Sequence, residues 1–283
     1  MSLPTHKLSV AIPQAALIGE GRGADVYAWG PGRILKLYRS KAAAGWAEQE
    51  AAITRAVGQA GLPAPAVEAV IEVDGRPGII FERIEGPTML RAAPTRPWML
   101  VRWARVLARL HAAMHDRSIP QLPSQRQQLE QQIRFAGQLS AELRQAALDA
   151  LARLPDGTAL CHGDFHPDNV LMSPGGPVIV DWDGATSGNP AADVARTSLM
   201  IRTGRPTPPT ALPWLVERFR PVFHSLYMKW YARLRPADAR QVAAWQLPVA
   251  AARLADCIPA EEPSLMAIVH RQALAARQPA QRN

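Results

Sequence analysis

The sequence predicts an α+β protein, with a small antiparallel sheet near its N-terminal end and a larger, mostly helical part after it. Short alternating runs separated by glycine turns fill the first 85 residues, which is typical of antiparallel hairpins. From residue 97 onward, apolar residues recur at every third or fourth position, the period of amphipathic helices. A chain of 283 residues with 48% hydrophobic residues can bury a sizeable core.

The net charge of +8 is unevenly distributed. The first 85 residues hold nine Lys/Arg and nine Asp/Glu, so the whole excess belongs to the rest of the chain. The arginines there are scattered along helical stretches, with no zinc-finger spacing and no RNP-like motif. We therefore expect solvated helix faces and no nucleic-acid partner.

Targeting signals and cysteine content indicate the cellular compartment that we expect for this protein. No apolar run is long enough to cross a bilayer, and the first residues lack the pattern of a signal peptide. We expect a cytoplasmic protein with no membrane partner. Cys161 and Cys257 are far apart in sequence and are expected to be buried, reduced thiols.

Residues 16–29 predict a strand, a glycine turn and a second strand. Gly19, Gly21 and Gly23 lie in this turn, and glycines allow a backbone to approach phosphate groups closely. A purely structural hairpin explains the same glycines equally well. The position of the turn, one hairpin before a strand that carries a lysine, favours the phosphate-binding interpretation.

The next predicted strand covers residues 33–38 and places Lys36 between two leucines. The chain has only four lysines, so one inside an apolar strand is unusual for it. A buried ammonium group needs a partner, because an unpaired buried charge is costly. Glu50 on the helix predicted to begin at residue 47 is the natural candidate, and Glu48 is the competing one.

The remaining elements follow from turns and periodicity. Residues 67–73 and 79–81, joined by a turn at 74–78, complete the sheet, and residues 82–86 leave it. Helical periodicity then covers residues 97–114, where His111 is expected to be a packing residue. Further helical stretches are predicted at 125–154, from 189 onward, and at 212–233, 237–256 and 262–276.

Between these helices, residues 158–183 combine short apolar runs with acidic groups. The runs 170–172 and 178–180 flank a turn and predict a hairpin, with Asp164 and Asn169 before it and Asp181 just after it. Folding the hairpin brings the three side chains to one end. Asn169 and Asp181 offer the hard oxygen ligands that suit Mg²⁺, which leaves Asp164 to act as a base on a substrate hydroxyl.

Two histidines in this stretch allow another interpretation. His162 and His166 are four residues apart, as in some zinc-binding helices, but Pro167 argues against a helix that presents both on one face. No Glu follows the first histidine as it does in metalloprotease helices. We interpret His162 as a structural histidine and leave the role of His166 open.

The pattern His162-Gly163-Asp164, four residues, then Asn169, followed by Asp181-Trp182-Asp183, resembles the aminoglycoside phosphotransferase and choline kinase-like family. Protein kinases have His-Arg-Asp and Asp-Phe-Gly at the corresponding places. Gly163 and Trp182-Asp183 favour the small-molecule branch. The resemblance implies a bilobal protein-kinase-like fold, with an N-terminal nucleotide-binding lobe at 1–85, a hinge at about 82–86, and a C-terminal catalytic and substrate-binding lobe at 86–283.

The resemblance also implies residue roles. Asp164 would be the catalytic base, and Asn169 and Asp181 would bind Mg²⁺. Lys36, paired with Glu50, would contact the α and β phosphates of ATP, next to the glycine turn. Backbone groups of Glu82 and Ile84 would meet the adenine edge. His162, Asp183 and Asp193 would support the site, Asp193 by bracing the catalytic loop through backbone hydrogen bonds.

The implied activity is ATP- and Mg²⁺-dependent phosphoryl transfer to a hydroxyl of a small molecule. The acceptor stays open between an aminoglycoside, choline, homoserine, a sugar or another hydroxylated metabolite. A polycationic aminoglycoside would need acidic groups in the helical part, and Asp256, Glu261 and Glu262 form the only acidic cluster late in the chain. A nucleotide-binding module without turnover is the alternative from another class.

Overall fold

The computed structural model describes residues 6–7, 17–21, 23–93, 96–204, 213–236 and 239–277. The chain forms two compact units. The first, here called the sheet unit, combines the chain up to Pro87 with Val170–Asp183. The second, the helical unit, combines Thr88–Asn169 with the chain from Gly184 onward.

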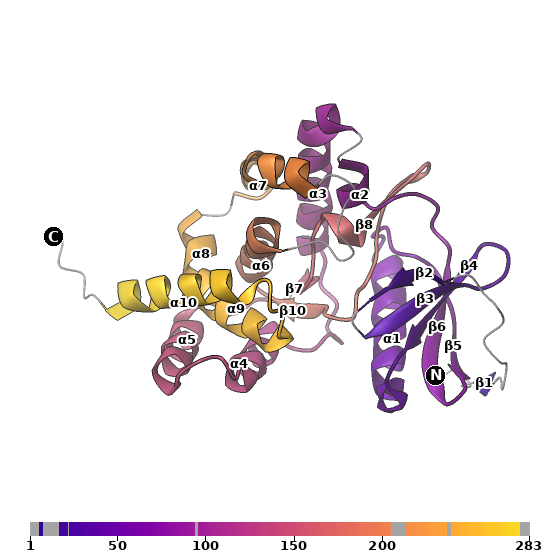
Figure 1. The fold of residues 1–283 in the computed structure, drawn as a ribbon, viewed down its shortest axis with the longest axis horizontal. Coiled ribbons are helices and arrows are strands. Elements are labelled where there is room, and N and C mark those ends of the chain that lie inside the picture. The colour runs from indigo at the N-terminus through magenta and orange to yellow at the C-terminus, as the bar shows by residue number, and fades with distance from the viewer. Residues whose placement is uncertain are drawn as a thin grey trace. The chain divides into compact units, whose positions relative to one another are not determined.

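The sheet unit is built on a six-stranded sheet with the strand order β1-β5-β6-β4-β3-β2 (Figure 1). The short strand β1 pairs with β5 in parallel, and all other neighbours in the sheet are antiparallel. This confirms the predicted α+β class and the small antiparallel sheet. The strands are β1 His6–Lys7, β2 Leu17–Glu20, β3 Ala24–Ala28, β4 Arg33–Tyr38, β5 Val67–Val73 and β6 Arg76–Glu82.

One helix, α1 (Ala44–Gln59), packs against β5 and β6 on one face of this sheet. Successive side chains of a strand point to opposite faces, and β4 shows this clearly. Leu35 and Leu37 join the apolar cluster on one face, whereas Ile34 and Tyr38 join the cluster that includes Ala47 of α1. Lys36 alternates with the leucines and so belongs to the face that α1 covers.

The hairpin of β8 (Val170–Ser173) and β9 (Gly176–Ile179) belongs to the sheet unit. The Met172 N–H donates to the Pro87 carbonyl oxygen at 2.9 Å, and the Ile179 N–H donates to the Pro63 carbonyl oxygen at 2.8 Å. These backbone bonds attach a late segment to the early part of the chain. The predicted N-terminal lobe of residues 1–85 does not include this segment, because residues far apart in sequence carry no signal of such pairing.

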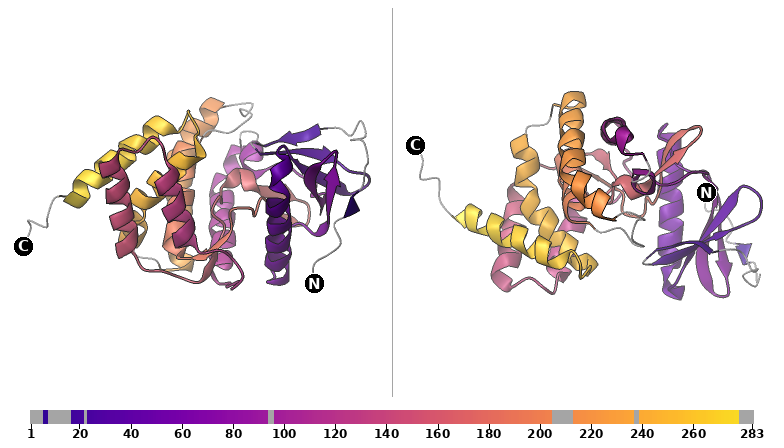
Figure 2. Two further views of the ribbon diagram at one scale, coloured as in Figure 1. Left: turned by 90° about the horizontal axis from the view of Figure 1, so that it is seen from below. Right: turned by 45° about the horizontal axis from the view of Figure 1, so that its top comes forward.

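The helical unit contains one small sheet and a set of helices. Strands β7 (Ala159–Cys161) and β10 (Thr186–Gly188) pair antiparallel. Helices α3 and α7 lie side by side, and α9 packs against α4, α5, α6 and α10 (Figure 2). The helices are α2 Met89–Ala92, α3 Leu100–His115, α4 Gln125–Phe135, α5 Ala141–Arg153, α6 Pro190–Thr203, α7 Pro213–Leu234, α8 Ala239–Ala244, α9 Gln246–Arg253 and α10 Glu262–Arg277, with 3₁₀ turns η1 Lys41–Ala43, η3 Pro97–Met99, η4 Pro167–Asn169 and η5 Leu254–Asp256.

Two predicted helices are interrupted. The stretch 125–154 is divided into α4 and α5, because the backbone turns away after Phe135 and Ser140 caps a new helix by accepting from the Leu143 N–H. The stretch 237–256 is divided into α8, α9 and η5. The apolar periodicity continues across these breaks and does not reveal them, because α4 and α5 face the same core, and so do α8 and α9.

The cysteines differ in environment. Cys161 is buried in β7, as expected, but Cys257 is exposed, which corrects the expectation of two buried thiols. Cys257 ends η5 in a left-handed conformation with φ of 49°, so it lies at a surface turn and not in a helix interior. Among the described residues, no helix is both long and apolar enough to span a bilayer.

Candidate active site

In the sheet unit, the predicted lysine lies in a network of carboxylates. The Lys36 Nζ donates to Glu50 Oε1 at 2.8 Å, to Glu50 Oε2 at 2.9 Å and to Asp181 Oδ1 at 2.6 Å. The Tyr38 hydroxyl also donates to Glu50 Oε2. Glu50 is therefore the partner of Lys36, and the competing Glu48 is exposed.

Electrostatics keep this lysine charged. Burial opposes the charge on Lys36, but Asp181, Glu50 and Asp183 outweigh it and hold the Lys36 pKa well above its usual value. Burial, together with the adjacent Glu50 charge, also keeps the Tyr38 hydroxyl protonated by raising its pKa. Lys36 thus presents a permanent positive charge at a fixed place.

Asp181 follows β9 in a left-handed backbone conformation with φ of 66°. Such a conformation is uncommon for residues other than glycine, and it clusters at functional sites. The next residue, Trp182, is fully buried, and its Nε1–H donates to the Ile179 carbonyl oxygen at 3.1 Å. The buried indole holds the turn, which lets the Asp181 side chain stay 42% exposed while it reaches Lys36.

The glycine turn and the residues after β6 were predicted to meet the nucleotide. The Gly21 N–H donates to the Ala24 carbonyl oxygen at 2.8 Å, which closes the turn. A Cβ on Gly23 would meet nothing within 4 Å, so the fold itself does not require a glycine there. The Glu82 N–H is already used by the Ala66 carbonyl oxygen at 2.9 Å, so it is not available to an adenine base.

In the helical unit, Asp193 organises the loop that carries the motif His162-Gly163-Asp164. Helix α6 begins where Asn189 caps it and Pro190 occupies its first turn, which puts Asp193 one turn inside the helix. Its carboxylate accepts from the His162 N–H at 2.7 Å and from the Gly163 N–H at 2.9 Å. Two backbone groups of the loop are thereby tied to a helix.

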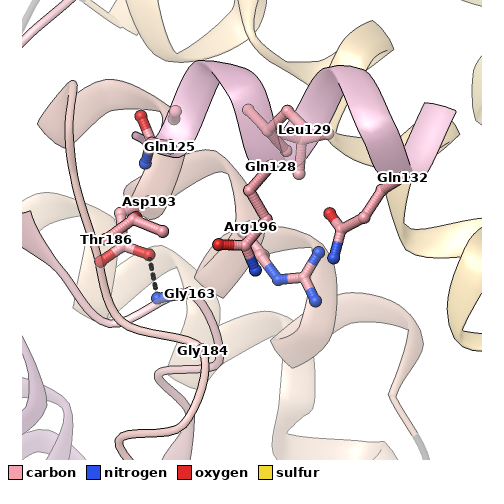
Figure 3. A pocket seen from close by; sticks show the side chains of 11 residues that line it. Gln125, Gln128, Leu129, Gln132, Gly163, Gly184, Thr186, Asp193 and Arg196 are labelled. Carbon is pink, nitrogen blue, oxygen red and sulfur yellow. Dashed lines mark hydrogen bonds between the residues drawn. The ribbon is translucent and has the colours of Figure 1, made fainter. Parts of the chain in front are cut away.

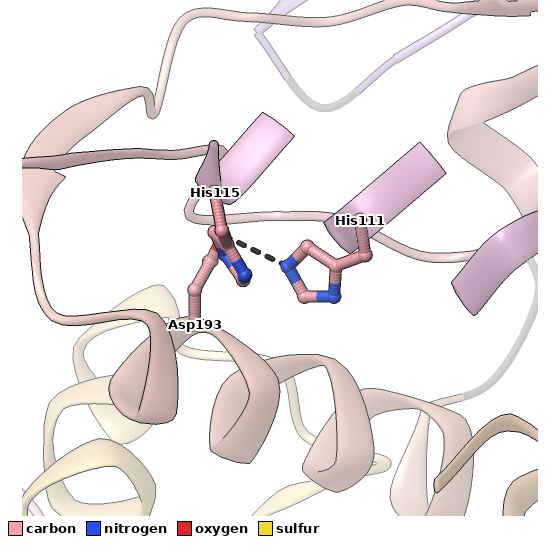
Figure 4. A group of neighbouring side chains, drawn as sticks. All are labelled: His111, His115 and Asp193. Carbon is pink, nitrogen blue, oxygen red and sulfur yellow. Dashed lines mark hydrogen bonds and ion pairs between the residues drawn. The ribbon is translucent and has the colours of Figure 1, made fainter. Parts of the chain in front are cut away.

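Two histidines of α3 complete the surroundings of Asp193 (Figure 4). The Nε2 atoms of His111 and His115 lie 3.1 and 3.4 Å from Asp193 Oδ2, and their Nδ1 atoms lie 2.7 and 2.6 Å from the hydroxyls of Tyr227 and Tyr231. Every ring nitrogen thus has a hydrogen-bond partner without a metal ion. Burial lowers the pKa of both histidines, that of His115 to about 4, so they are neutral donors to Asp193.

Asp164 itself is held by an arginine and a histidine. Arg253 Nη1 donates to Asp164 Oδ1 at 3.0 Å, and His166 Nε2 lies 3.4 Å from Asp164 Oδ2. Burial favours the protonated acid, but His166, Arg196 and Arg253 outweigh it and hold the Asp164 pKa well below its usual value. Asp164 is therefore an ionised group with fixed orientation, and Asp164 in turn raises the pKa of His166 against the effect of burial.

Arg253 is in turn fixed by other carboxylates. Its Nε and Nη2 donate to the two oxygens of buried Glu261 at 3.0 and 3.2 Å, and its Nη1 also donates to Asp256 Oδ2 at 3.0 Å. A bidentate pair of this kind sets the plane of the guanidinium group. Asp256 and Glu261, which the sequence offered as an acidic cluster for a polycation, are instead ion-paired with arginine.

His162 and Asn169 hold the backbone of Asp164 by hydrogen bonds. The Asp164 N–H donates to His162 Nδ1 at 3.2 Å, and Asn169 Nδ2 donates to the Asp164 carbonyl oxygen at 2.9 Å. His162 is completely buried, which agrees with a structural histidine. Because its Nδ2 donates in this bond, the amide oxygen of Asn169 is the atom of that side chain that can act as an acceptor.

Sequence reasoning missed Arg253, Arg196 and the pair of tyrosines on α7. Arg253 did carry a signal, because it stands in the apolar run Leu247–Leu254, where a lone arginine needs carboxylate partners. Arg196 lies one helical turn after Asp193 on the same face of α6. Tyr227 and Tyr231 have the same four-residue spacing as His111 and His115, which two helices in contact would bring together.

Two solved structures with a similar fold are an aminoglycoside phosphotransferase and an amicoumacin kinase. A thermostable mutant of aminoglycoside phosphotransferase APH(4)-Ia, in a ternary complex with AMP-PNP and hygromycin B, is similar with a TM-score of 0.66, 18% identity and coverage of 95% of each chain. Amicoumacin kinase hAmiN in complex with AMP-PNP, Ca²⁺ and Ami gives 0.63, 15% identity, and 96% and 90% coverage of this chain and that chain. These likenesses establish the fold.

Sequence comparisons identify the family. A mouse (Mus musculus) protein, acyl-CoA dehydrogenase family member 10, is 26% identical over 175 residues, which are 54% of this chain but only 16% of the mouse protein. The family model described as "Phosphotransferase enzyme family" matches residues 14–213, which include Lys36, Asp164 and Asp181. By this match over most of its length, the chain belongs to the phosphotransferase enzyme family.

Proposed function

We propose that this protein transfers the γ-phosphoryl group of ATP to a hydroxyl of a small molecule. The strongest support is the ion-pair network in which Lys36 is held by Glu50 and Asp181, residues from three separate parts of the chain. A lysine kept charged beside an exposed aspartate suits the binding of phosphate groups next to a metal ion. Membership of the phosphotransferase family supports the same reaction class.

The nucleotide would be bound mainly by the sheet unit. Lys36 would neutralise the α and β phosphates, and Glu50 would hold its ammonium group in place. The turn with Gly19, Gly21 and Gly23 would let the backbone approach the phosphates closely, although the Gly21 N–H itself is already used by the Ala24 carbonyl oxygen. Because the Glu82 N–H is already used, the adenine edge would meet the Glu82 carbonyl oxygen and the Ile84 N–H.

The donors for a divalent cation fit Mg²⁺. Asp181 of the sheet unit would contribute a half-exposed carboxylate and Asn169 of the helical unit an amide oxygen, and each is a hard ligand of the kind that Mg²⁺ prefers. Asp183 would assist from the same turn. When bound, the ion would neutralise charge on the phosphate oxygens. Solved structures of the same fold that hold AMP-PNP, one of them with Ca²⁺, support a nucleotide and a divalent cation here.

The helical unit would supply the group that addresses the acceptor. Asp164 accepts a hydrogen bond from the acceptor hydroxyl and so aligns its oxygen for in-line attack. Its low pKa makes it a weak base early in the reaction, which suits a loose transition state in which the proton leaves late. Arg253 and His166 fix the orientation of the carboxylate, and Asp193 fixes the loop.

The test is an ATP-consumption screen over aminoglycosides, amino alcohols, hydroxy acids and sugars, with Asp164→Asn as the blank. We expect Asp164→Asn to bind Mg·ATP normally and to lose transfer by about 10²–10⁴-fold, the usual contribution of a positioned acid–base group. We expect Asp181→Ala to lose Mg·ATP binding, measured by calorimetry.

The control is Asp149→Asn, a change at an exposed carboxylate of α5 that should leave both quantities unchanged. Transfer by Asp164→Asn at the wild-type rate would show that the base is another residue. Normal ATP binding without turnover on any acceptor would favour the nucleotide-binding module, and absence of ATP binding would reject the proposed function.

A further inference from the structure

A pocket in the helical unit borders the loop of the catalytic motif. Its empty space of about 340 Å³ includes open solvent, so the pocket is a shallow one that opens at the surface. Gly163, next to Asp164, forms part of its wall, and Figure 3 shows Arg196 and the glutamines of α4 around it. The residues that line it are Gln125, Gln128, Leu129, Gln132, Gly163, Gly184, Thr186, Ala192, Asp193, Arg196 and Val249.

The pocket lining contains two charged residues, Asp193 and Arg196, which differ in how many of their polar atoms have a hydrogen-bond partner. Asp193 has its carboxylate oxygens engaged by two backbone N–H groups and two histidines. Arg196 has one nitrogen bonded, since its Nη2 donates to Asp256 Oδ2 at 3.2 Å. Within the part of the chain that the structure describes, its buried Nε and Nη1 atoms have no acceptor. The wall of the pocket therefore contains buried donors without a partner, whereas its one carboxylate is engaged.

We propose that Arg196 binds an anionic group, a carboxylate or a phosphate, of the acceptor molecule. Each two-pronged edge of a guanidinium pairs Nη2 with either Nε or Nη1, so the unpartnered Nε or Nη1 of Arg196 can donate to one oxygen of such a group while the second N–H of Nη2 faces the other oxygen. The amides of Gln128 and Gln132, on the facing helix α4, supply further hydrogen-bonding groups for the same ligand. This inference rests on the proposed function and specifies its acceptor as a hydroxylated anion.

Nearby acidic groups do not favour a polycation. Asp164 and Glu261 are bound by Arg253, and Asp256 is shared by Arg253 and Arg196. A polycationic acceptor would have to displace arginines from these carboxylates. An anion at Arg196 satisfies donors that are otherwise buried without a partner, at no cost to the existing pairs.

The test compares acceptors that differ only in the charged group: a series of hydroxyalkanoates, the matching hydroxyalkyl phosphates, the neutral amides and the amino alcohols. For wild type, kcat/KM should be at least about tenfold higher for one of the anionic series than for its neutral amide. Arg196→Gln should abolish this preference by raising KM for the anion and not for the amide, whereas any change in kcat that arises through Asp164 should be the same for both acceptors.

Two variants guard against a folding artefact. Arg196→Lys keeps the charge without the fork and should recover part of the affinity, and Arg202→Gln, at an exposed arginine of the same helix, should behave as wild type. Thermal melting of each variant checks its fold. An equal loss by Arg196→Gln on all acceptors, or a wild-type preference for amino alcohols or aminoglycosides, would overturn the proposal.

A binding measurement separates this proposal from the proposed function. If ATP binds but no anionic compound of the series binds or reacts, the anion site is wrong and the kinase assignment stands. If ATP does not bind, the proposed function fails first. Binding of the hydroxyalkanoate or hydroxyalkyl phosphate that is weakened in Arg196→Gln and not in Arg202→Gln would support the site even before an acceptor is phosphorylated.

Discussion

Lys36 shows how one residue can be both buried and charged. Its side chain is only 16% exposed, and its ammonium group meets carboxylates of Glu50 and Asp181. Removal of one carboxylate leaves the other beside Lys36, so the loss of stability should be smaller than when a lone buried ion pair is broken. Glu50 differs from Asp181 because it is almost fully buried and also accepts from Tyr38.

We expect Glu50→Gln to lower the free energy of unfolding by about 1–3 kcal/mol, because a buried charge-assisted hydrogen bond is weakened. The KM for ATP should rise by about tenfold, the equivalent of about 1.4 kcal/mol, since Lys36 is no longer held. Chemical denaturation and steady-state kinetics measure the two effects.

The matched control is Glu48→Gln, two residues earlier on the same helix and exposed. It should change stability by no more than about 0.5 kcal/mol and leave the KM for ATP unchanged. An equal effect of both variants would mean that the loss of a negative charge from α1, and not the loss of the ion pair with Lys36, causes the change in stability and KM.

At the scale of elements, the loop before η4 depends on a close approach between backbones. Gly163 has φ of +79°, and a Cβ there would lie 2.3 Å from the Gly184 carbonyl oxygen. The N–H of Gly163 also binds Asp193, so the loop cannot move away without losing that bond. This explains why a glycine stands where protein kinases have an arginine.

Gly163→Ala should therefore destabilise the protein by roughly 1–3 kcal/mol, the cost of a strained left-handed residue, and reduce transfer because Asp164 is displaced. Gly137→Ala is the control, because a Cβ there would meet nothing within 4 Å and its φ lies outside the left-handed region. Denaturation midpoints and kcat test the pair. A Gly163→Ala variant as stable and active as Gly137→Ala would contradict the close-approach argument.

At the scale of the whole molecule, buried histidines couple stability to pH. His115 has its pKa lowered to about 4 by burial, and that of His111 is lowered in the same way, whereas Asp164 raises the pKa of His166. Between about pH 4 and 6.5, the unfolded chain binds protons at His115 that the folded chain does not. Stability is lost there as the pH falls.

The free energy of unfolding should thus decrease from pH 6.5 toward 4, by up to about 1.4 kcal/mol per pH unit for each such histidine. His166 affects stability in the opposite direction. Its stabilising contribution to the free energy of unfolding is fully present below about pH 6.5, and it is lost as the pH rises through the raised pKa of His166. The two effects together place maximum stability near neutral pH.

Denaturation of wild type and His115→Gln between pH 4 and 8 tests this. The variant should have a smaller slope on the acid side, while His270→Gln, at an exposed histidine, should keep the wild-type slope. Identical slopes in all three proteins would show that the pKa of His115 does not differ between the folded and the unfolded protein.

The sequence by itself determined the local elements and the family. Alternation and turns predicted the hairpins of the sheet unit and the hairpin β8–β9, because these depend on neighbours along the chain. The spacing of His162, Asp164 and Asn169, followed by Asp181, was enough to indicate the phosphotransferase family, which the family match confirms.

Only the tertiary structure decided which side chains meet. Glu48 and Glu50 are two residues apart, about 200° around a helix, so the docking of α1 on the sheet selects the partner of Lys36. Arg196 and Arg253 lie on different helices, and packing alone brings them to Asp256 and turns an apparent acidic cluster into a set of ion pairs. The period of a helix reveals its buried face, but the neighbour that covers this face depends on contacts distant in sequence.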